Sequence, residues 1–142
     1  MCECCKREVI VSDQAPKAIG PYSIGVQGGH FVFTSGQLGL DPVTGNLVEG
    51  GIEAETRLVF ANLRTVLQAA GSDLEHVVKT TVYLQDINDF SRMNEIYSKY
   101  FTEAPPARSA FQVGKLPKGA AVEIEAVAII PCKEGDCHCK DG

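Results

Sequence analysis

The amino-acid sequence predicts a single α+β domain in which two amphipathic helices pack on one face of a single mixed β-sheet. Three observations support this fold class. The 142 residues are enough for one domain with a full core and too few to expect two. A hydrophobic fraction of 44% with 22% charged residues is typical of a chain that folds by burial rather than a disordered one. Strand-like and helix-like segments follow one another in the order β-β-α-β-α-β-β, which lets both helices cover the same face.

The first two strands are short and are separated by turn-rich sequence. Residues 9–11 form a β-branched run, and the proline- and glycine-rich stretch at 12–25 indicates a structured loop. Residues 31–34 favour a second strand, which stops at Ser35 and Gly36. The sequence DPVTGN at 41–46 has the composition of a turn, so we expect a hairpin here.

Two amphipathic helices flank a buried strand in the middle of the chain. Apolar residues recur at helical spacing over 52–70, and Gly71 follows where helices commonly end with glycine. Residues 77–84 are rich in β-branched side chains and predict a largely buried strand. A second apolar stripe over 90–101 predicts another helix, which the proline pair at 105–106 closes.

The last two strands are predicted at 109–113 and 122–130, and the turn between them favours an antiparallel pair. Because side chains alternate along a strand, Glu123 and Glu125 share one face with aliphatic residues, and the other face is apolar. A helix-free face that mixes carboxylates with aliphatic side chains suits a subunit interface around a polar site better than open water.

Charge and hydropathy narrow the class of partner. The chain has 18 acidic and 13 basic residues, a formal net charge of −5 and no cluster of Lys and Arg, which argues against nucleic acid as a partner. The longest apolar run, 126–130, is far shorter than the roughly 20 residues that span a bilayer. The first residues resemble neither a secretory signal nor a transit peptide, so we expect a cytoplasmic protein without a membrane partner.

All six cysteines lie near the two ends of the chain, so we divide it into a cysteine-rich N-terminal tail (1–8), one domain (9–131) and a cysteine-rich C-terminal tail (132–142). We expect no metal and no cysteine nucleophile in the domain itself. This density of soft ligands in the tails is typical of thiophilic metal binding, with flexible reduced tails or acylation as alternatives. The candidate tail ligands are Cys2, Cys4, Cys5, Cys132, Cys137 and Cys139.

A series of short segments, each weak alone, follows in a characteristic order between residues 15 and 130. They include TSGQLGLDP, VVKTTVYLQDINDF, NEIYSKYF, PPARSA and LPKGAAVEIEAVAI. In this order the sequence resembles the RidA (YjgF-type) family of reactive-intermediate deaminases. The resemblance implies a chorismate-mutase-like fold and a homotrimer with sites between adjacent subunits. It also implies hydrolysis of enamine or imine products of pyridoxal-phosphate enzymes, such as 2-aminoacrylate, to 2-keto acids and ammonia, a reaction that requires no metal or organic cofactor.

The resemblance also implies roles for individual residues. Arg108, in PARS, is expected to bind the substrate carboxylate, and Glu123, in VEIEA, to position or activate the attacking water. Tyr22 and Ser35 have polar tips suited to orienting water or the imine nitrogen, and Gly36 offers its backbone amide.

Two positions depart from the pattern of many deaminating members of the family. Ile24 stands where they carry glutamine, which bears on substrate range, and Ala110 stands where they carry cysteine. Ala110 is expected to contribute only its backbone to substrate binding, and thiol-based regulation at that position is excluded.

Elementary chemistry fits these roles and leaves alternatives open. The planar guanidinium of Arg108 can bind a carboxylate through two hydrogen bonds, yet most arginines in loops are solvated or form surface ion pairs. Burial in an interface would raise the pKa of Glu123 toward neutrality. The alternation of polar and apolar residues along the strand is equally consistent with Glu123 on a solvent-exposed face. One of Glu123 and Glu125 could be catalytic while the other pairs with Arg108 or a neighbouring subunit. Tyr22 and Ser35 could equally be structural.

Two functions of other classes compete with an imine hydrolase. A non-catalytic trimer that binds a small carboxylate would also use Arg108, so Glu123 distinguishes it from an enzyme. An endoribonuclease-like RNA-binding member of the family would need a basic surface, against which the net charge of −5 argues.

Overall fold

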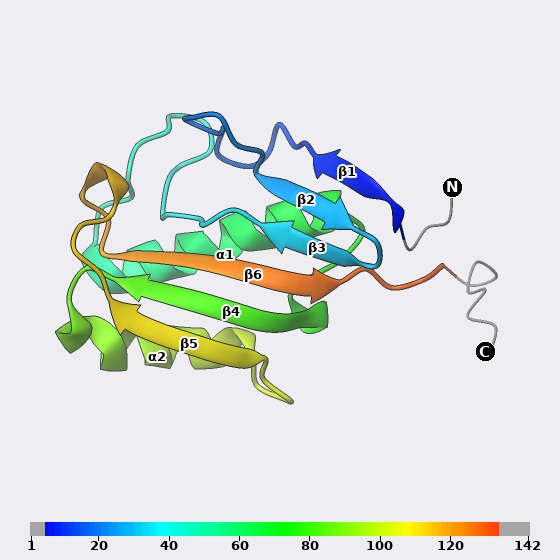
Figure 1. Ribbon diagram of the computed structural model, residues 1–142. Coiled ribbons are helices and arrows are strands. Elements are labelled where there is room, and N and C mark those ends of the chain that lie inside the picture. Colours follow the sequence, from blue (N-terminus) through cyan, green and yellow to red (C-terminus); the bar gives the residue numbers. More distant parts are fainter. Residues whose placement is uncertain (1–4, 134–142) are drawn as a thin grey trace.

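Residues 5–133 are described in the computed structural model, and within them six strands form one mixed sheet in the order β1-β2-β3-β6-β4-β5 (Figure 1). Two helices lie on the same side of this sheet, as predicted. The strands are β1 (Arg7–Ile10), β2 (Gly25–Gly28), β3 (Phe31–Thr34), β4 (Val77–Leu84), β5 (Ala107–Gln112) and β6 (Val122–Ile129). The helices are α1 (Gly51–Ala69) and α2 (Phe90–Tyr100), with short 3-10 helices at Leu74–His76, Ile87–Asp89 and Pro117–Gly119.

The central elements begin and end close to where the sequence predicts them. Helix α1 is shifted by one residue from the predicted 52–70, β4 matches 77–84, and α2 ends one residue early. The apolar stripe of α1 faces the sheet, with Val59, Phe60 and Leu63 fully buried. Burying a side chain of this size contributes about 1.5–3 kcal/mol, so packing against the sheet stabilises the helix. No helix in the described part of the chain combines the length and the apolar character needed to cross a membrane.

The predicted antiparallel pairing of the last two strands is wrong. Strand β5 pairs with β4 in parallel, and β6 lies between β3 and β4, antiparallel to both (Figure 1). Alternate residues of β6 are buried from Val122 to Ala128, whereas none of β5 is buried. A strand with one fully buried face belongs inside the sheet, and a partly exposed strand belongs at its edge. The connection at 113–121 is long enough to carry the chain across β4.

No strand is predicted from the sequence where β2 lies, directly after the loop expected at 12–25. The sequence GVQG begins and ends with glycine, which is uncommon in strands. Strand β2 forms a hairpin with β3 through a turn at Gly29, whose φ is +60°. Across 41–46, where we expected the hairpin, the structure has an isolated bridge between Leu40 and Leu47. Gly25 permits close packing, since a Cβ there would lie 3.0 Å from Cγ1 of Val66 in α1 and the valine would have to shift.

The two faces of the sheet differ in what they bury. The apolar side chains of β6 face the helices, while Glu123 and Glu125 face the opposite side and are half-buried. That helix-free face also carries exposed apolar side chains, with Phe33 49%, Phe111 46% and Ile129 42% exposed. A single chain therefore leaves a partly apolar, acid-bearing surface uncovered.

Candidate active site

Glu123 lies against Gly36, where the segment after β3 pairs with β6. The Gln37 amide donates to the carbonyl of Ile124 at 2.9 Å, and the Ile124 amide donates to the carbonyl of Gln37 at 3.1 Å. A Cβ at position 36 would lie only 2.7 Å from the carboxyl carbon and Oε2 of Glu123. Glycine at this position is therefore what allows the carboxylate to lie directly on the backbone.

A small pocket of about 60 Å³ opens beside Glu123. Its wall is mainly apolar and includes Ile24, Tyr22 and Gly36, with Lys17 as the cation that lines it. The structure thus brings three of the predicted site residues, Tyr22, Gly36 and Glu123, to one place. Ligand pockets commonly enclose about 300–1,000 Å³, so this pocket alone is too small to enclose a typical small molecule.

Tyr22 and Ser35 are held by hydrogen bonds around this pocket. The Tyr22 hydroxyl accepts from the Ile19 amide at 3.1 Å, and the tyrosine is half-exposed. Ser35 Oγ donates to the carbonyl of Ser23 at 2.5 Å. Both contacts shape the loop before β2. The hydroxyl proton of Tyr22 remains available to donate, whereas the proton of Ser35 is already engaged.

Burial raises the pKa of Glu123, and the charge of Glu125 raises it further. The two glutamates lie on the same face of β6, two positions apart. None of residues 5–133 donates a hydrogen bond to the Glu123 carboxylate that would oppose this shift. A carboxylate with a raised pKa can accept a proton and return it near neutral pH, which is the property required of a general base and acid.

Tyr83 fixes the position of Glu125 on the same face. Its hydroxyl donates to Oε1 of Glu125. This hydrogen bond, together with burial, raises the pKa of Tyr83 to about 12, so the tyrosine remains a donor at neutral pH. The ring of Phe111 packs edge-on against it, with the centroids 5.3 Å apart. Glu125 is thereby held close enough to Glu123 for its charge to act on that residue.

Arg108 lies on the edge strand β5, and its guanidinium is held by α2. Nη1 donates to Oδ1 of Asn94 at 2.6 Å. The guanidinium carbon lies 4.7 Å from the ring centroid of Tyr97 and 5.3 Å from that of Phe90. These three residues share one face of α2, because they recur at helical spacing. Stacking fixes the plane of the guanidinium and leaves other N–H groups to bind a carboxylate.

The backbone of Ala110 faces the open edge of the sheet beside Arg108. The Val113 amide donates to the carbonyl of Leu84 at 2.9 Å. In a parallel ladder alternate amides face the partner strand, so the amide of Ala110 points away from β4. Because β5 is the last strand of the sheet, this amide lies at an uncovered edge. The geometry fits the expected use of the Ala110 backbone.

Arg108 and Glu123 do not meet within one chain. The register of β4 aligns Arg108 with Thr80, which is buried toward the helices, and Glu123 with Tyr83, which faces the opposite side. The two charges therefore lie on opposite faces of the sheet and two strands apart. Pairing of Glu125 with Arg108 of the same chain does not occur either, since Glu125 contacts Tyr83.

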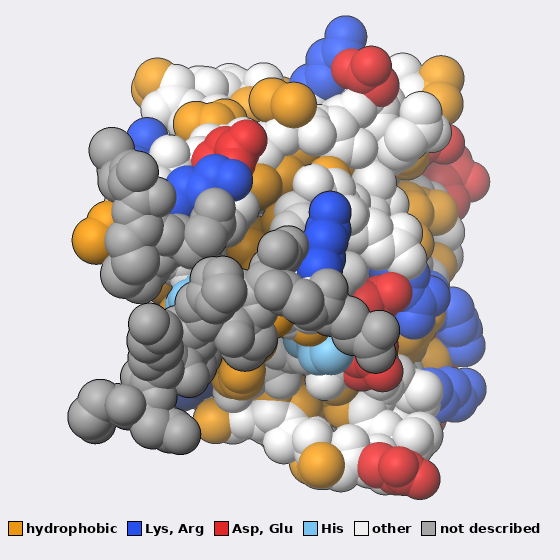
Figure 2. All heavy atoms as spheres, turned by 90° about the vertical axis from the view of Figure 1, so that its right-hand side faces the viewer, with side chains coloured by type: hydrophobic (Ala, Val, Ile, Leu, Met, Phe, Trp, Pro, Cys, Tyr) orange, Lys and Arg blue, Asp and Glu red, His pale blue; other side chains and the backbone are white. Residues whose placement is uncertain are grey.

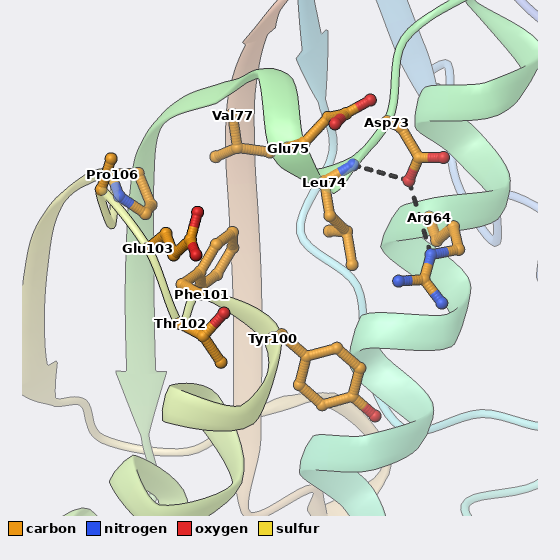
Figure 3. Close-up of a pocket in the computed structure, with 11 residues that line it drawn as sticks. Arg64, Asp73, Leu74, Glu75, Val77, Tyr100, Phe101, Thr102, Glu103 and Pro106 are labelled. Atoms are coloured by element: carbon orange, nitrogen blue, oxygen red, sulfur yellow. Dashed lines mark hydrogen bonds and ion pairs between the residues drawn. The ribbon is translucent and has the colours of Figure 1, made fainter.

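A wider hollow of about 590 Å³ lies between the end of α1 and the loop that follows α2 (Figure 3). Nε of Arg64 lies 3.4 Å from Oδ1 of Asp73, which also accepts from the Leu74 amide at 2.7 Å. Glu75 and Glu103 add two further acids, and none of the predicted site residues lines the hollow. Because its lining cation is already paired, this hollow fits an anionic substrate poorly.

The predicted metal site of the tails lies mostly outside the described residues. Cys5 and Cys132 are described and exposed, and the other four predicted ligands fall outside residues 5–133. Within 5–133, no group of three His, Cys, Asp or Glu side chains is arranged to hold a metal ion.

Comparison with known proteins places these features in a family. The family model described as Endoribonuclease L-PSP, the RidA (YjgF-type) family, matches residues 12–130. The chain belongs to the RidA family. A human relative named 2-iminobutanoate/2-iminopropanoate deaminase is 53% identical to this RidA-family chain over 123 residues, which cover 87% of the chain and 90% of the relative.

Solved structures of RidA-family proteins share the fold. RidA from the Antarctic bacterium Psychrobacter matches with a TM-score of 0.83 and 46% identity, over 87% of this chain and 99% of that one. TdcF from E. coli with bound serine matches with a TM-score of 0.82 and 40% identity, over 86% and 98%. The predicted chorismate-mutase-like α+β fold is confirmed. The roles of individual residues and the tail boundaries stay predictions.

The residues that hold Arg108 and Glu125 in this RidA-family chain were not foreseen from its sequence. Asn94 and Tyr97 orient Arg108, and Tyr83 holds Glu125. A signal for Asn94 was present, because it is a polar residue at helical spacing within the apolar stripe of α2. Tyr83 could not be found in this way, because its contact with Glu125 depends on which strands pair.

Proposed function

We propose that the protein is a hydrolytic imine deaminase, which converts 2-aminoacrylate-type enamines and imines to 2-keto acids and ammonia in the cytoplasm. The observation that carries this proposal is the Glu123 carboxylate, which has a raised pKa and lies on Gly36 beside a small, mainly apolar pocket. The 53% identity to the human protein named for this chemistry supports it. The proposed reaction uses no metal or organic cofactor.

In this mechanism the enamine first takes a proton from solvent at C3 and becomes the protonated 2-imino acid. Glu123 accepts a proton from water as the water oxygen attacks C2, which gives a tetrahedral 2-amino-2-hydroxy acid. Glu123 then gives this proton to the nitrogen, the C2–N bond breaks to release ammonia, and the carboxylate takes the proton of the C2 hydroxyl as the new carbonyl forms. One water is consumed for each ammonia released. Tyr22, whose hydroxyl proton is available, orients the water, and the Gly36 amide and Ser35 shape its surroundings.

We propose that each site combines Arg108 of one chain with Glu123 of another in a homotrimer. The opposite-face placement of these two residues supports this, because neither can complete the site within its own chain. Arg108 and the Ala110 amide at the edge of β5 would bind the substrate carboxylate, and the Glu123 pocket of the neighbour would supply the water. The exposed apolar side chains around Phe33 would be covered by that neighbour.

Sedimentation equilibrium at micromolar concentration should give three times the 15.2 kDa mass of one chain. Phe33→Glu should shift the mass toward that of one chain and abolish activity, because it places a charge in the proposed contact while the residue is 49% exposed in the single chain. Far-UV circular dichroism checks that the variant remains folded. A stable, active monomer would contradict a site shared between chains.

The proposed activity is measured by coupling the protein to a pyridoxal-phosphate dehydratase that generates 2-aminoacrylate. We expect 2-keto acid to appear faster than by uncatalysed hydrolysis, which sets the baseline. Equal release rates with and without the protein, across several amino-acid precursors, would contradict the deaminase proposal. The alternative function, a trimer that binds small carboxylates without catalysis, would then be favoured.

The description of the family model raises ribonuclease activity as a second candidate. The net charge of −5 argues against it, since RNA affinity depends on contacts between basic groups and phosphates. We therefore expect no RNA cleavage by the purified protein above that of a Glu123→Gln, Arg108→Ala double variant. RNA cleavage by the wild type that disappears in the double variant would favour ribonuclease activity as the function.

Glu125→Gln should move the acidic limb of the pH–rate profile to lower pH. Glu123 must be deprotonated to accept a proton from water, so activity falls as the pH drops through its pKa. The charge of Glu125 raises that pKa, and removing the charge lowers it. The profile of kcat/KM against pH measures the shift, with Glu95→Gln on the exposed face of α2 as the control. An unchanged acidic limb would show that Glu125 does not tune the base.

A further inference from the structure

Glu55, near the start of α1, is a buried acid that the proposed mechanism does not use. Charged side chains lie on the surface of the molecule, as Figure 2 shows for one end of it. Glu55 is 4% exposed and is the only acidic or basic side chain within residues 5–133 that is buried. Burying a carboxylate costs free energy unless the group is paired or hydrogen-bonded. The contacts of Glu55 therefore indicate its part in the fold.

Glu55 accepts a hydrogen bond from the chain just before the strand that carries Glu123. The Ala121 amide, directly before β6, donates to Oε1 of Glu55 at 2.8 Å. Burial raises the pKa of Glu55, the hydrogen bond from Ala121 opposes this shift, and the charge of Asp89 adds to it. None of the ion pairs within residues 5–133 includes Glu55. Backbone amides at the start of β6, rather than a cation, hold this carboxylate.

The same helix contacts the other chain segment that forms the small pocket of the site. A Cβ at Gly39 would lie only 2.8 Å from Cα of Glu55, so this segment packs directly on the helix backbone. Asn62, about two turns further along α1, donates from Nδ2 to the carbonyls of Leu38 and Leu40, both at 3.0 Å. Both leucines line the pocket. Helix α1 therefore holds segment 36–40 and the start of β6 together.

Glu123 can lie on Gly36 only while these two segments stay in register. Gln37 and Ile124 exchange two backbone hydrogen bonds, at 2.9 and 3.1 Å, and Glu55 fixes the β6 side of this pairing. A shift of β6 relative to segment 36–40 would move the Glu123 carboxylate off Gly36 and expose it to water. Because burial is the main cause of the raised pKa of Glu123, such exposure would lower that pKa.

We propose that Glu55 is a positioning residue for Glu123, which fixes the start of β6 against segment 36–40 through the Ala121 amide. Its effect on turnover rests on the proposed deaminase function, whereas its effect on the surroundings of Glu123 does not. The role requires an acceptor of the right length and not a charge. Glutamine should therefore fulfil it, and a side chain without an acceptor should not.

Glu55→Met keeps most of the side-chain volume but removes the acceptor for the Ala121 amide. We expect kcat to fall by on the order of 10- to 100-fold, because a small displacement of a catalytic group is enough for such a loss. Affinity for a 2-keto acid analogue should change little, since carboxylate binding is assigned to Arg108. The acidic limb of the pH–rate profile should move to lower pH as Glu123 becomes exposed. The charged and titratable neighbours of Glu123 are unchanged in this variant, namely Glu125, Tyr83, Tyr22 and Lys17.

Glu55→Gln is the conservative variant, because its amide oxygen can still accept from Ala121 while the charge is gone. Its kcat should stay within about threefold of wild type, and its acidic limb should not move. Glu55→Asp keeps the charge but is one methylene shorter, so it should lose kcat as Glu55→Met does. A loss in Glu55→Gln equal to that in Glu55→Met would overturn the role of the acceptor.

Thr56→Val is the matched control, because Thr56 is the next residue of α1 and is also buried. Its hydroxyl donates within the helix, to the Ile52 carbonyl at 2.6 Å. This variant should change Tm without changing kcat or the acidic limb. If Glu55→Met likewise changed Tm alone, Glu55 would only stabilise the fold and the proposal would be overturned.

Carbon-13 NMR titration of the Glu123 carboxyl group measures its surroundings without any need for activity, with Glu123→Gln to assign the resonance. The midpoint should be lower in Glu55→Met than in the wild type and unchanged in Thr56→Val and Glu55→Gln. An equal drop in Glu55→Gln would mean that the charge of Glu55 acts on Glu123, and an unchanged midpoint in Glu55→Met would mean that Glu55 does not position it. Either result would overturn the proposal. Absence of keto-acid release by the wild type would contradict the deaminase alone, and this titration would still decide the role of Glu55.

Discussion

We expect Arg108→Ala to lower kcat/KM for 2-imino acid hydrolysis by about 30-fold to several thousandfold, because loss of the partner of a desolvated carboxylate costs about 2–5 kcal/mol. Asn94 and the rings of Phe90 and Tyr97 orient the guanidinium within the single chain. Binding therefore orders little more of the side chain, and most of the interaction is available to the substrate. Keto-acid release from the coupled dehydratase, measured at several substrate concentrations, gives the loss.

Three further variants separate the effect of the Arg108 charge from that of the guanidinium geometry and from non-specific effects of substitution. Arg108→Lys keeps the charge but loses the planar pair of donors, so it should restore activity only partly. Asn94→Ala leaves the guanidinium in place without the bond that orients it and should cause a smaller loss. Arg57→Ala, on the exposed face of α1, is the matched control and should behave as wild type. Activity of Arg108→Ala within about threefold of wild type, under roughly 1 kcal/mol, would remove Arg108 from the mechanism.

Glu123→Gln should lower kcat by on the order of 10²–10⁴-fold, the usual contribution of a positioned general base. Glutamine has nearly the same shape and still fits against Gly36, but it cannot accept a proton from water. Affinity for a stable 2-keto acid analogue should change little, because carboxylate binding is assigned to Arg108. Single-turnover kinetics and isothermal titration with the analogue measure the two effects separately. Equal losses in binding and turnover would instead make Glu123 a structural partner of the arginine.

Thermal unfolding shows whether this loss is chemical or structural. The pKa of Glu123 is raised by folding, so the wild type loses stability as the pH rises from the unfolded pKa through the folded pKa. At neutral pH the ionised carboxylate therefore lowers the stability of the folded state. Glu123→Gln removes that effect, and its Tm at pH 7 should equal or exceed that of the wild type. A markedly lower Tm would mean that the lost activity reflects damage to the fold.

The elements that local sequence determines were predicted well. Helix α1 carries apolar residues at helical spacing, strand β4 is rich in β-branched residues, and both lie within one residue of prediction. The alternation in β6 also predicted that Glu123 and Glu125 share the face away from the helices. These features depend on spacing within one segment, which a sequence shows directly.

The features that depend on contacts between distant segments could not be predicted. Alternation shows that Arg108 and Ser109 face opposite sides of β5, but not which of them faces the helices, because β5 lies at an edge and lacks a fully apolar face. That choice is set by its register with β4. The central position of β6 could not be predicted either. Its segment follows that of β5 directly in the sequence, which favoured a hairpin between the two, whereas β6 pairs with β3 and β4. The family resemblance predicts Arg108 and Glu123 as site residues, and only the fold shows that they lie on opposite faces of the sheet within one chain.

If each site combines Arg108 of one chain with Glu123 of another, as proposed, their placement on opposite faces of the sheet has a genetic consequence: two defective chains should restore each other's activity. An Arg108→Ala chain still provides Glu123, and a Glu123→Gln chain still provides Arg108. If subunits assemble at random from equal amounts, about one quarter of the interfaces in a cyclic oligomer receive both intact residues. Co-expressed alleles of this kind should recover roughly that fraction of activity, whereas a chain that carries both changes should complement neither. The unit on which loss-of-function mutations act would then be the interface between two polypeptides rather than the single chain.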